Sequence, residues 1–330
     1  MTPVATLVTG AAGFIGFHVV QRLAARGATV VGIDNLNDYY DPRLKRARLA
    51  RLEALPGFGF ERLDITDRAA IAELFARRRI GRVVHLAAQA GVRYSLSHPH
   101  AYVDANIVGT LNLLEAARAH PVEHFVYAST SSVYGANTKM PFAVEDRVDH
   151  PISLYAATKR ATEQMAWVYA LQFGVPATGL RFFTVYGPWG RPDMAAFKFV
   201  RAMLAGEPID VYNHGRMERD FTYVDDIAEG VVRVLERRPA PEGEVPHRVY
   251  NIGSHNPVPL LRFIDVLARA LGREPRMNML PMQPGDVAAT FADVGPLERD
   301  YGWRPTTTVE VGLPRFVAWY LEHYHGEGRG

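Results

Sequence analysis

The chain has 330 residues, 48% of them hydrophobic, and its 37 basic and 35 acidic side chains leave a formal charge of +2. The absence of cysteine excludes disulfides, thiolate nucleophiles and cysteine-ligated zinc. The 12 histidines show no metal-ligand spacing, and the sequence has neither a long basic run nor an apolar stretch of membrane-spanning length. We therefore expect a metal-free globular protein of the cytoplasm that binds neither nucleic acid nor membrane.

The first half of the chain alternates short apolar, β-branched runs with segments of helix length. Such alternation is typical of a parallel sheet with helices on both faces, so the predicted fold class is α/β with a doubly wound sheet. Strands are predicted at 6–10, 29–34, 82–88 and 124–130, and helices at 16–27, 69–79 and 106–120.

After about residue 180 the alternation loosens into shorter elements. Helices are predicted at 195–208 and 226–237, with short strands between them and an exposed loop at 238–247. The segment 248–254 reads as a strand that returns to the first sheet. The second half therefore predicts a smaller, discontinuous lobe.

The densest basic segment of the chain is RLKRARLARLEAL, at residues 43–55. We interpret it as the solvated face of a helix, because a run of this length is too short to form a nucleic-acid stripe.

The segment TGAAGFIG places Gly10, Gly13 and Gly16 after a strand and at the start of a helix. Glycines there let the backbone approach a pyrophosphate, whose charge lies on the helix N-terminal amides. Asp34 ends the next strand, where its carboxylate can accept ribose hydroxyls and would repel a 2′-phosphate, which favours NAD over NADP. The alternative is a simple tight turn with Asp34 capping a loop. It is disfavoured because strand, spacing, helix and acid occur together.

Tyr155 and Lys159 lie four residues apart in a helix-compatible run and so share one helix face. A phenol is a poor base near neutrality, but a nearby cation and ribose hydrogen bonds favour the phenolate. Such a tyrosine can take a proton from a hydroxyl while the attached carbon delivers hydride to nicotinamide. The hydroxyl cluster Thr130, Ser131 and Ser132 precedes the pair at a strand end, which favours this chemistry over a surface tyrosine and lysine.

The segments TGAAGFIG, ASTSSVYG and YAATK together resemble the extended short-chain dehydrogenase/reductases that act on nucleotide sugars. The resemblance runs nearly end to end, and AGVRYS and YGPWGRPDMA are most similar to UDP-glucuronate 4-epimerases. It implies a Rossmann domain for NAD at 1–180, with returning segments at about 222–255, and a lobe mainly for the UDP-sugar at 181–330. It also implies a homodimer and tightly bound NAD+ that is regenerated in each turnover.

The resemblance implies site residues of three kinds. Thr130, Tyr155 and Lys159 are the predicted catalytic residues. The predicted NAD contacts are Gly10, Gly13, Phe14, Ile15, Gly16, Asp34, Asn35, Asp64, Ile65, Leu86, Ala87, Ala88, Gln89, Asn106, Tyr155, Lys159, Phe182 and Val185. The predicted substrate contacts are Arg93, Thr130, Ser131, Ser132, Thr184, Arg191, Arg219 and Asp286.

Among the substrate contacts, Arg191 and Arg219 are candidates for the UDP phosphates, and Arg93 for the phosphates or the sugar acid. Gln283 stands where galactose epimerases carry a phosphate-binding arginine, which separates this chain from them at that position.

Relatives that eliminate water or decarboxylate carry acids directly after the threonine, where this chain has Ser131 and Ser132. Without a carboxylate there, a 4-keto sugar has no local acid or base to drive elimination. The resemblance therefore implies 4-epimerisation of UDP-glucuronate to UDP-galacturonate without decarboxylation. The alternatives are a UDP-glucose/UDP-galactose 4-epimerase and a decarboxylating UDP-glucuronate enzyme.

Overall fold

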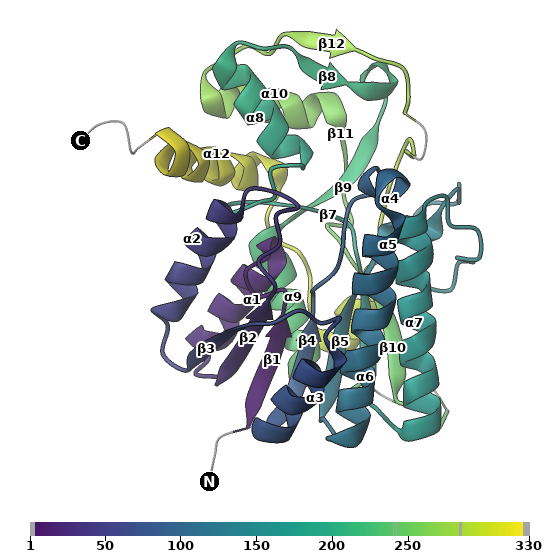
Figure 1. Ribbon diagram of the computed structural model, residues 1–330. Helices are drawn as coiled ribbons and strands as arrows, with labels where there is room; N and C mark the ends of the chain where they lie inside the picture. Colours follow the sequence, from purple (N-terminus) through teal and green to yellow (C-terminus); the bar gives the residue numbers. More distant parts are fainter. Residues whose placement is uncertain (1–3, 240, 242, 284–285, 326–330) are drawn as a thin grey trace.

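The computed structural model describes residues 4–239, 241, 243–283 and 286–325 and shows a large sheet domain that carries a smaller lobe at one end (Figure 1). Pro284 and Gly285, between Gln283 and Asp286, lie outside the described residues. Within the described part of the chain, no helix combines the length and the apolar character needed to cross a membrane.

The main sheet is parallel and has the strand order β10-β6-β5-β4-β1-β2-β3. The chain order reverses between β1 and β4, so the loops leaving these strands diverge and open a crevice at their carboxyl ends. The strands are β1 (Ala5–Thr9), β2 (Val30–Asp34), β3 (Phe58–Arg62), β4 (Ile80–His85), β5 (His124–Thr130), β6 (Ala177–Phe182) and β10 (His247–Ile252).

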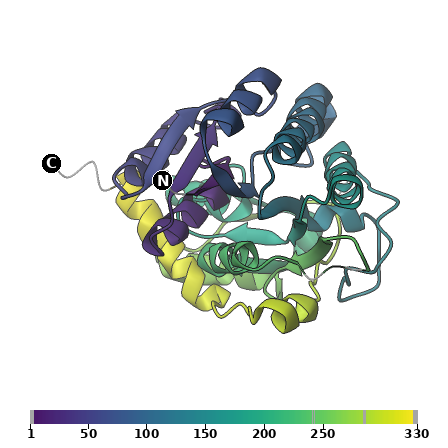
Figure 2. The same cartoon turned by 90° about the horizontal axis from the view of Figure 1, so that it is seen from below.

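Helices cover both faces of this sheet, as the view from below shows (Figure 2). One face carries α1 (Phe14–Ala25), α2 (Pro42–Glu53) and α9 (Val224–Glu236), and the other carries α3 (Arg68–Arg77), α6 (Gly109–Ala119) and α7 (Leu154–Phe173). Because both faces are covered, β1, β2 and β6 are buried along their whole length. The predicted doubly wound α/β fold is confirmed, as is the strand that returns to the sheet, which is β10 beside β6.

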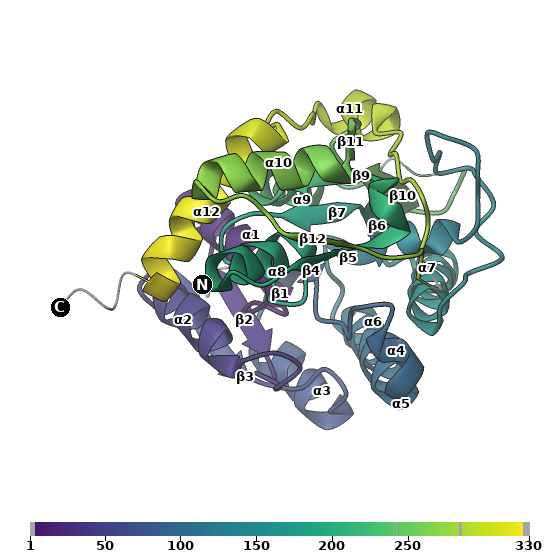
Figure 3. The same cartoon turned by 90° about the horizontal axis from the view of Figure 1, so that it is seen from above.

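The smaller lobe lies over the carboxyl ends of the sheet strands when the molecule is seen from above (Figure 3). Two small sheets and the helices packed on them form this lobe. The first sheet has the order β11 (Pro257–Pro259), β9 (Glu218–Tyr223) and β7 (Thr184–Tyr186). The second is the pair β12 (Met277–Met279) and β8 (Ile209–Val211). The helices are α8 (Ala195–Ala205), α10 (Leu260–Leu271) and α12 (Val309–His325).

Short helical segments connect these elements. They are α4 (Tyr94–Ser97), α5 (Pro99–Tyr102), the π-helical turn η1 (Val103–Val108), the 3₁₀ turns η2 (Ser131–Tyr134) and η3 (Tyr212–Gly215), and α11 (Gly295–Tyr301).

The interpretation of residues 43–55 as a solvated helix face is wrong for part of α2. Arg43, Arg46 and Arg51 are exposed, but Lys45 and Arg48 are buried. They lie on the side of α2 that also buries Leu44, Leu49 and Leu52, and backbone oxygens accept the hydrogen bonds of both charged groups. A buried cation needs such acceptors, and α2 supplies the two side chains from one face.

Candidate active site

The turn between β1 and α1 brings the backbone unusually close to its neighbours. Gly10 has φ +70°, and a Cβ there would lie 2.8 Å from the amide nitrogen of Ala87, while a Cβ on Gly16 would lie 2.1 Å from the Gly10 oxygen. The first turn of α1 has no side-chain cap and no acidic residue. Its amides are therefore available to an anion, and the close backbone packing leaves the cradle that a pyrophosphate needs.

The ends of β2 and β3 bring three predicted cofactor residues together. The Leu36 amide donates to Oδ1 of buried Asp34 at 2.8 Å, which fixes that carboxylate at the strand end. Asn35 donates to Asp64 Oδ2 at 2.8 Å. Burial favours the neutral form of Asp64, but hydrogen bonds from Asn35 and Thr66 outweigh it and lower the pKa of that carboxyl. The Asp64 carboxyl therefore stays ionised beside the predicted adenosine site.

The segment Leu86–Gln89 continues β4 along the edge of the crevice. Asn106 fixes its far end, because its Oδ1 accepts the Gln89 amide at 2.9 Å and its Nδ2 donates to the Gln89 carbonyl at 3.0 Å. Nδ2 also donates to the hydroxyl of Thr158 at 3.0 Å. The amide of Asn106 thus holds the predicted cofactor edge against α7.

Tyr155 lies in the first turn of α7, which Ser153 caps by accepting the Ala156 amide at 3.2 Å. Burial raises the pKa of Tyr155, whereas a hydrogen bond with Thr130 and the charge of Arg191 lower it. Arg191, whose charge lowers this pKa, comes from the loop before α8. The role of Lys159 as the stabilising cation stays a prediction.

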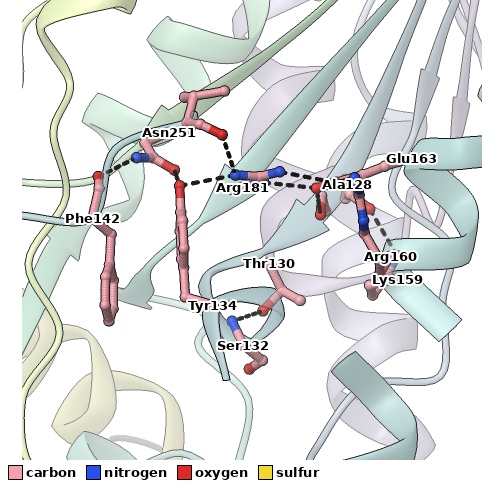
Figure 4. A network of polar contacts seen from close by, with 12 residues as sticks. Ala128, Thr130, Ser132, Tyr134, Phe142, Lys159, Arg160, Glu163, Arg181 and Asn251 are labelled. Atoms are coloured by element: carbon pink, nitrogen blue, oxygen red, sulfur yellow. Dashed lines mark hydrogen bonds and ion pairs between the residues drawn. The ribbon is translucent and has the colours of Figure 1, made fainter. Parts of the chain in front are cut away.

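The ammonium of Lys159 points along α7 toward the end of β5 and donates to the Ala128 carbonyl at 2.8 Å (Figure 4). Burial lowers the pKa of Lys159 to about 8, and the charge of Glu163 acts in the opposite direction. The lysine therefore sits on the inner face of α7, one turn beyond Tyr155.

Behind Lys159, Glu163 forms a buried network that the sequence analysis missed. Its carboxylate accepts two bonds from Arg181 at 2.8 and 3.0 Å, one from Arg160 at 2.9 Å and one from the Ser129 hydroxyl at 2.6 Å (Figure 4). The signal was available, because Glu163 continues the four-residue spacing that sets Tyr155 and Lys159 on one face. The network fixes β5 to α7 immediately before the hydroxyl cluster.

The hydroxyl cluster turns away from β5 into η2. Thr130 Oγ1 accepts the Ser132 amide at 3.2 Å (Figure 4), and Thr130 is one of the groups that lower the pKa of Tyr155. Ser131 and Ser132 are partly exposed. The acid on this part of α7, Glu163, is held by two arginines and a hydroxyl, so it is not available to the cluster as a proton donor or acceptor.

A small cavity of about 20 Å³ lies between the sheet domain and the lobe. Phe14, Thr184, Val185 and Arg191, all predicted site residues, line it together with Met194. Two other predicted cofactor residues, Phe182 and Ile65, are buried in the apolar packing that supports the crevice.

The Arg191 guanidinium is ion-paired with Asp193, with Nε 2.9 Å from Oδ1. The Tyr39 hydroxyl donates to the same carboxylate at 3.2 Å. Neither Tyr39 nor Asp193 was predicted, and the printed sequence gives no spacing signal that joins residue 39 to residue 193.

Arg219 and Arg93 are the other residues predicted to bind the phosphates. Arg219 Nη2 lies 3.3 Å from Asp286 Oδ1, so the structure brings these two predicted residues together. Burial lowers the pKa of Arg219, and Asp286 acts in the opposite direction. Arg93 is exposed, with its guanidinium 5.2 Å from the centre of the Tyr212 ring.

Among the residues that the structure describes, no group of three or more histidine, aspartate or glutamate side chains is arranged to hold a metal ion.

The sequence and the fold match known proteins along almost the whole chain. The model of the NAD dependent epimerase/dehydratase family matches residues 6–253. The probable UDP-glucuronate 4-epimerase of Rhizobium meliloti (strain 1021) is 51% identical over 96% of this chain and 97% of its own length.

Two solved structures extend the comparison. The UDP-glucuronic acid 4-epimerase of Bacillus cereus, in complex with UDP-glucuronic acid and NAD, has a TM-score of 0.90 and 36% identity over 97% of this chain and 100% of its own. The UDP-glucose 4-epimerase of Thermotoga maritima, with UDP-glucose, has a TM-score of 0.86 and 31% identity over 97% and 99%. With the glycine cradle and Asp34 in place, these matches show that the chain belongs to the NAD dependent epimerase/dehydratase family.

Proposed function

We propose that this enzyme converts UDP-glucuronate to UDP-galacturonate by NAD-dependent 4-epimerisation, without decarboxylation. The observation that carries the proposal is the site around Tyr155, where Thr130 and Arg191 lower the pKa of the phenol and the nearby carboxylate of Glu163 is held by two arginines and Ser129. The 51% identity to a probable UDP-glucuronate 4-epimerase supports the uronate over the neutral sugar, whose structural match is 31% identical.

The chain supplies the proton transfer and the positioning. Bound NAD+ accepts a hydride from C4 of the sugar and returns it later in the same turnover. Tyr155 takes the O4 proton as C4–H leaves, and Thr130 holds O4 within reach of the phenol. After the 4-keto sugar has rotated in the pocket, Tyr155 returns the proton to O4 as the hydride adds to the other face of C4. Proton and hydride are both restored, so the net reaction has no redox change.

The 4-keto uronate is a β-keto acid, and its carboxylate must be held to prevent loss of CO2. Ser131, Ser132 and Thr184 supply hydroxyl donors for that carboxylate, which charge-assisted hydrogen bonds hold firmly. Arg160 and Arg181 are both ion-paired with Glu163, so the Glu163 carboxylate does not repel the carboxylate of the sugar.

The cationic residues divide between the two ends of the substrate. Arg219 and Asp286 lie together in the lobe, which supports a place at the diphosphate and the ribose. Arg191 acts on Tyr155, which supports a place at the sugar, in preference to the phosphate site predicted from the sequence.

We also propose a homodimer that forms through α6 and α7. These helices pack side by side. They expose Leu111 on α6 and Val168 and Leu171 on α7, an apolar surface that a second copy would cover. A Leu171→Glu variant is expected to sediment as a monomer, and an unchanged dimer would contradict this interface. The cytoplasmic location stays a prediction.

Product analysis after incubation with UDP-glucuronate, without added cofactor, tests the function. The expected product is UDP-galacturonate, with no UDP-pentose and no CO2. A parallel incubation with UDP-glucose is expected to give little product, and conversion of the neutral sugar alone would exclude the uronate assignment. A Tyr155→Phe variant is expected to lose about 10²- to 10⁴-fold in turnover, the usual contribution of a general acid–base residue. Full turnover in that variant would exclude Tyr155 as the base.

A further inference from the structure

Arg48 is a fully buried cation whose partners are all neutral. Its side chain donates to the Ala12 carbonyl at 2.9 Å, to the Tyr40 hydroxyl at 2.6 Å and to the Trp189 carbonyl at 2.6 and 3.2 Å, with a longer contact to Gly190 O at 3.4 Å. Among the described residues, no carboxylate lies within ion-pairing distance of it. Burying a cation without an anion is unfavourable, so its retention calls for an explanation beyond packing.

The acceptors of Arg48 belong to two separate turns of the crevice. Ala12 lies in the glycine-rich turn that forms the cofactor cradle. Trp189 and Gly190 lie in the turn directly before Arg191, the residue whose charge acts on Tyr155. One guanidinium therefore joins the cofactor cradle to the loop that carries this arginine.

The sheet domain also holds the second turn in an unfavourable backbone conformation. Trp189 has φ +63°, in the left-handed region that a bulky residue rarely adopts. His18 of α1 donates to the Pro188 carbonyl at 2.9 Å, and the Arg51 guanidinium of α2 lies 4.9 Å from the centre of the Trp189 ring. The turn before Arg191 is thus docked on α1 and α2, the helices next to the cradle.

We propose that Arg48 is a positioning residue that couples NAD retention to the placement of Arg191 at the cavity between the sheet domain and the lobe. A guanidinium spreads its donors over three nitrogens in one fixed plane, whereas an ammonium donates from a single nitrogen, so arginine is required to span both turns. With no carboxylate to balance it, the charge also favours the anionic pyrophosphate at the N-terminus of α1. The inference rests on the proposed function for its turnover measurement only.

The test compares Arg48→Met and Arg48→Lys with Arg46→Met, an exposed position on the same helix. NAD is released from each purified protein and quantified, and NAD is titrated back into stripped protein. Both Arg48 variants are expected to bind NAD at least tenfold more weakly, and the Arg46 variant is expected to match the wild type. The Arg48→Lys variant keeps a buried cation, so it separates the loss of the fork from the loss of charge.

The pH profile of turnover is the second measurement, because a merely structural role would not shift it. The groups that face Tyr155 are Arg191, Thr130 and, at 6.0 Å between ring centres, Tyr102, with Lys159 one turn along its own helix. Only the placement of Arg191 depends on the turn that Arg48 holds. Loss of that placement removes an influence that lowers the pKa of Tyr155, so the rise in activity with pH is expected to move to higher pH in both variants.

Circular dichroism and thermal melting show whether each variant is folded. If Arg48→Met does not fold, Arg48→Lys carries the test. A folded Arg48 variant that binds NAD as tightly as the wild type overturns the proposal. A variant with weakened NAD affinity but an unshifted pH profile also overturns it, because Arg48 would then not couple the cofactor cradle to Arg191. If the wild type does not epimerise UDP-glucuronate, the proposed function fails, and the NAD titration still decides whether Arg48 serves the cradle.

Discussion

Arg181 and Arg48 are both buried arginines, 2% and 0% exposed, but their surroundings differ. Arg181 on β6 forms two hydrogen bonds to Glu163, whereas Arg48 on α2 meets only carbonyl and hydroxyl oxygens. The first is an internal ion pair behind Lys159. The second is a lone cation between two loops of the crevice.

The difference separates two uses of a buried charge. In the pair, each charge is the reason why the other can be buried, and the hydrogen bonds fix β5, β6 and α7 to one another. Arg48 has no such partner, so its burial has to be explained by the function of the two turns, at Ala12 and Trp189, whose carbonyls it binds. Stability experiments can test this distinction directly.

The largest expected effect comes from breaking the pair. Arg181→Met leaves Glu163 as a buried anion that keeps only Arg160 and Ser129, and we expect the free energy of unfolding to fall by about 3–5 kcal/mol. Urea denaturation monitored by circular dichroism measures it. Arg160→Met is the matched control, because the Arg160 side chain is 30% exposed and its loss should cost less. Equal losses of unfolding free energy in the two variants would show that the bidentate Arg181–Glu163 pair stabilises the fold no more than the Arg160–Glu163 pair does.

The pH dependence of this loss gives a second, smaller effect. Burial favours the protonated form of Glu163, but in the wild type its hydrogen bonds and the Arg181 charge outweigh burial and lower the pKa. Its stabilising contribution is thus present above the unfolded carboxyl pKa of about 4.3 and is lost as pH falls through the lower folded value.

In Arg181→Met, burial dominates and raises the pKa of Glu163 above its unfolded value, so the folded variant takes up a proton in mild acid. The stability gap to the wild type is expected to narrow by about 1 kcal/mol between pH 7 and pH 5, since one pKa unit corresponds to about 1.4 kcal/mol. Urea denaturation at both pH values measures the gap. A gap that stays constant would mean that Glu163 remains ionised without Arg181.

A smaller loss of stability at pH 7 is expected at the lone cation. Arg48→Met leaves no unpaired charge behind, but it leaves the buried carbonyls of Ala12 and Trp189 without their donor. We expect the free energy of unfolding to fall by about 1–2 kcal/mol, measured by the same urea titration at pH 7. A loss as large as that of Arg181→Met would make both arginines structural and would remove the distinction between them.

The sequence predicted the architecture because local patterns determine much of it. Alternating β-branched runs and amphipathic segments indicate a doubly wound sheet, and buried strands such as β2 and β6 keep that signal clear. The sequence analysis missed the burial of Arg48 because it took the charged side chains of residues 43–55 to be exposed. Helical spacing gave a contrary signal, since Arg48 falls on one face with Leu44 and Leu52.

The site could be predicted only where its parts lie close together in the chain. The spacing of Tyr155 and Lys159 places both on α7, and the same spacing extends to Glu163. The action of Arg191 on Tyr155 depends on how the lobe closes over the sheet, which no local pattern records. The pairing of Tyr39 with Asp193 likewise joins two distant loops.

The position of β10 at the edge of the main sheet also bears on how the chain folds during synthesis. β6 is buried along its entire length, and its outer edge pairs with β10, which the ribosome makes only after the first part of the lobe and α9. Until then, β6 presents an apolar strand with unpaired backbone groups, the kind of edge that recruits other chains. The nascent protein therefore passes through a stage in which the last strand of its main sheet is missing, and the pairing of β10 closes that edge.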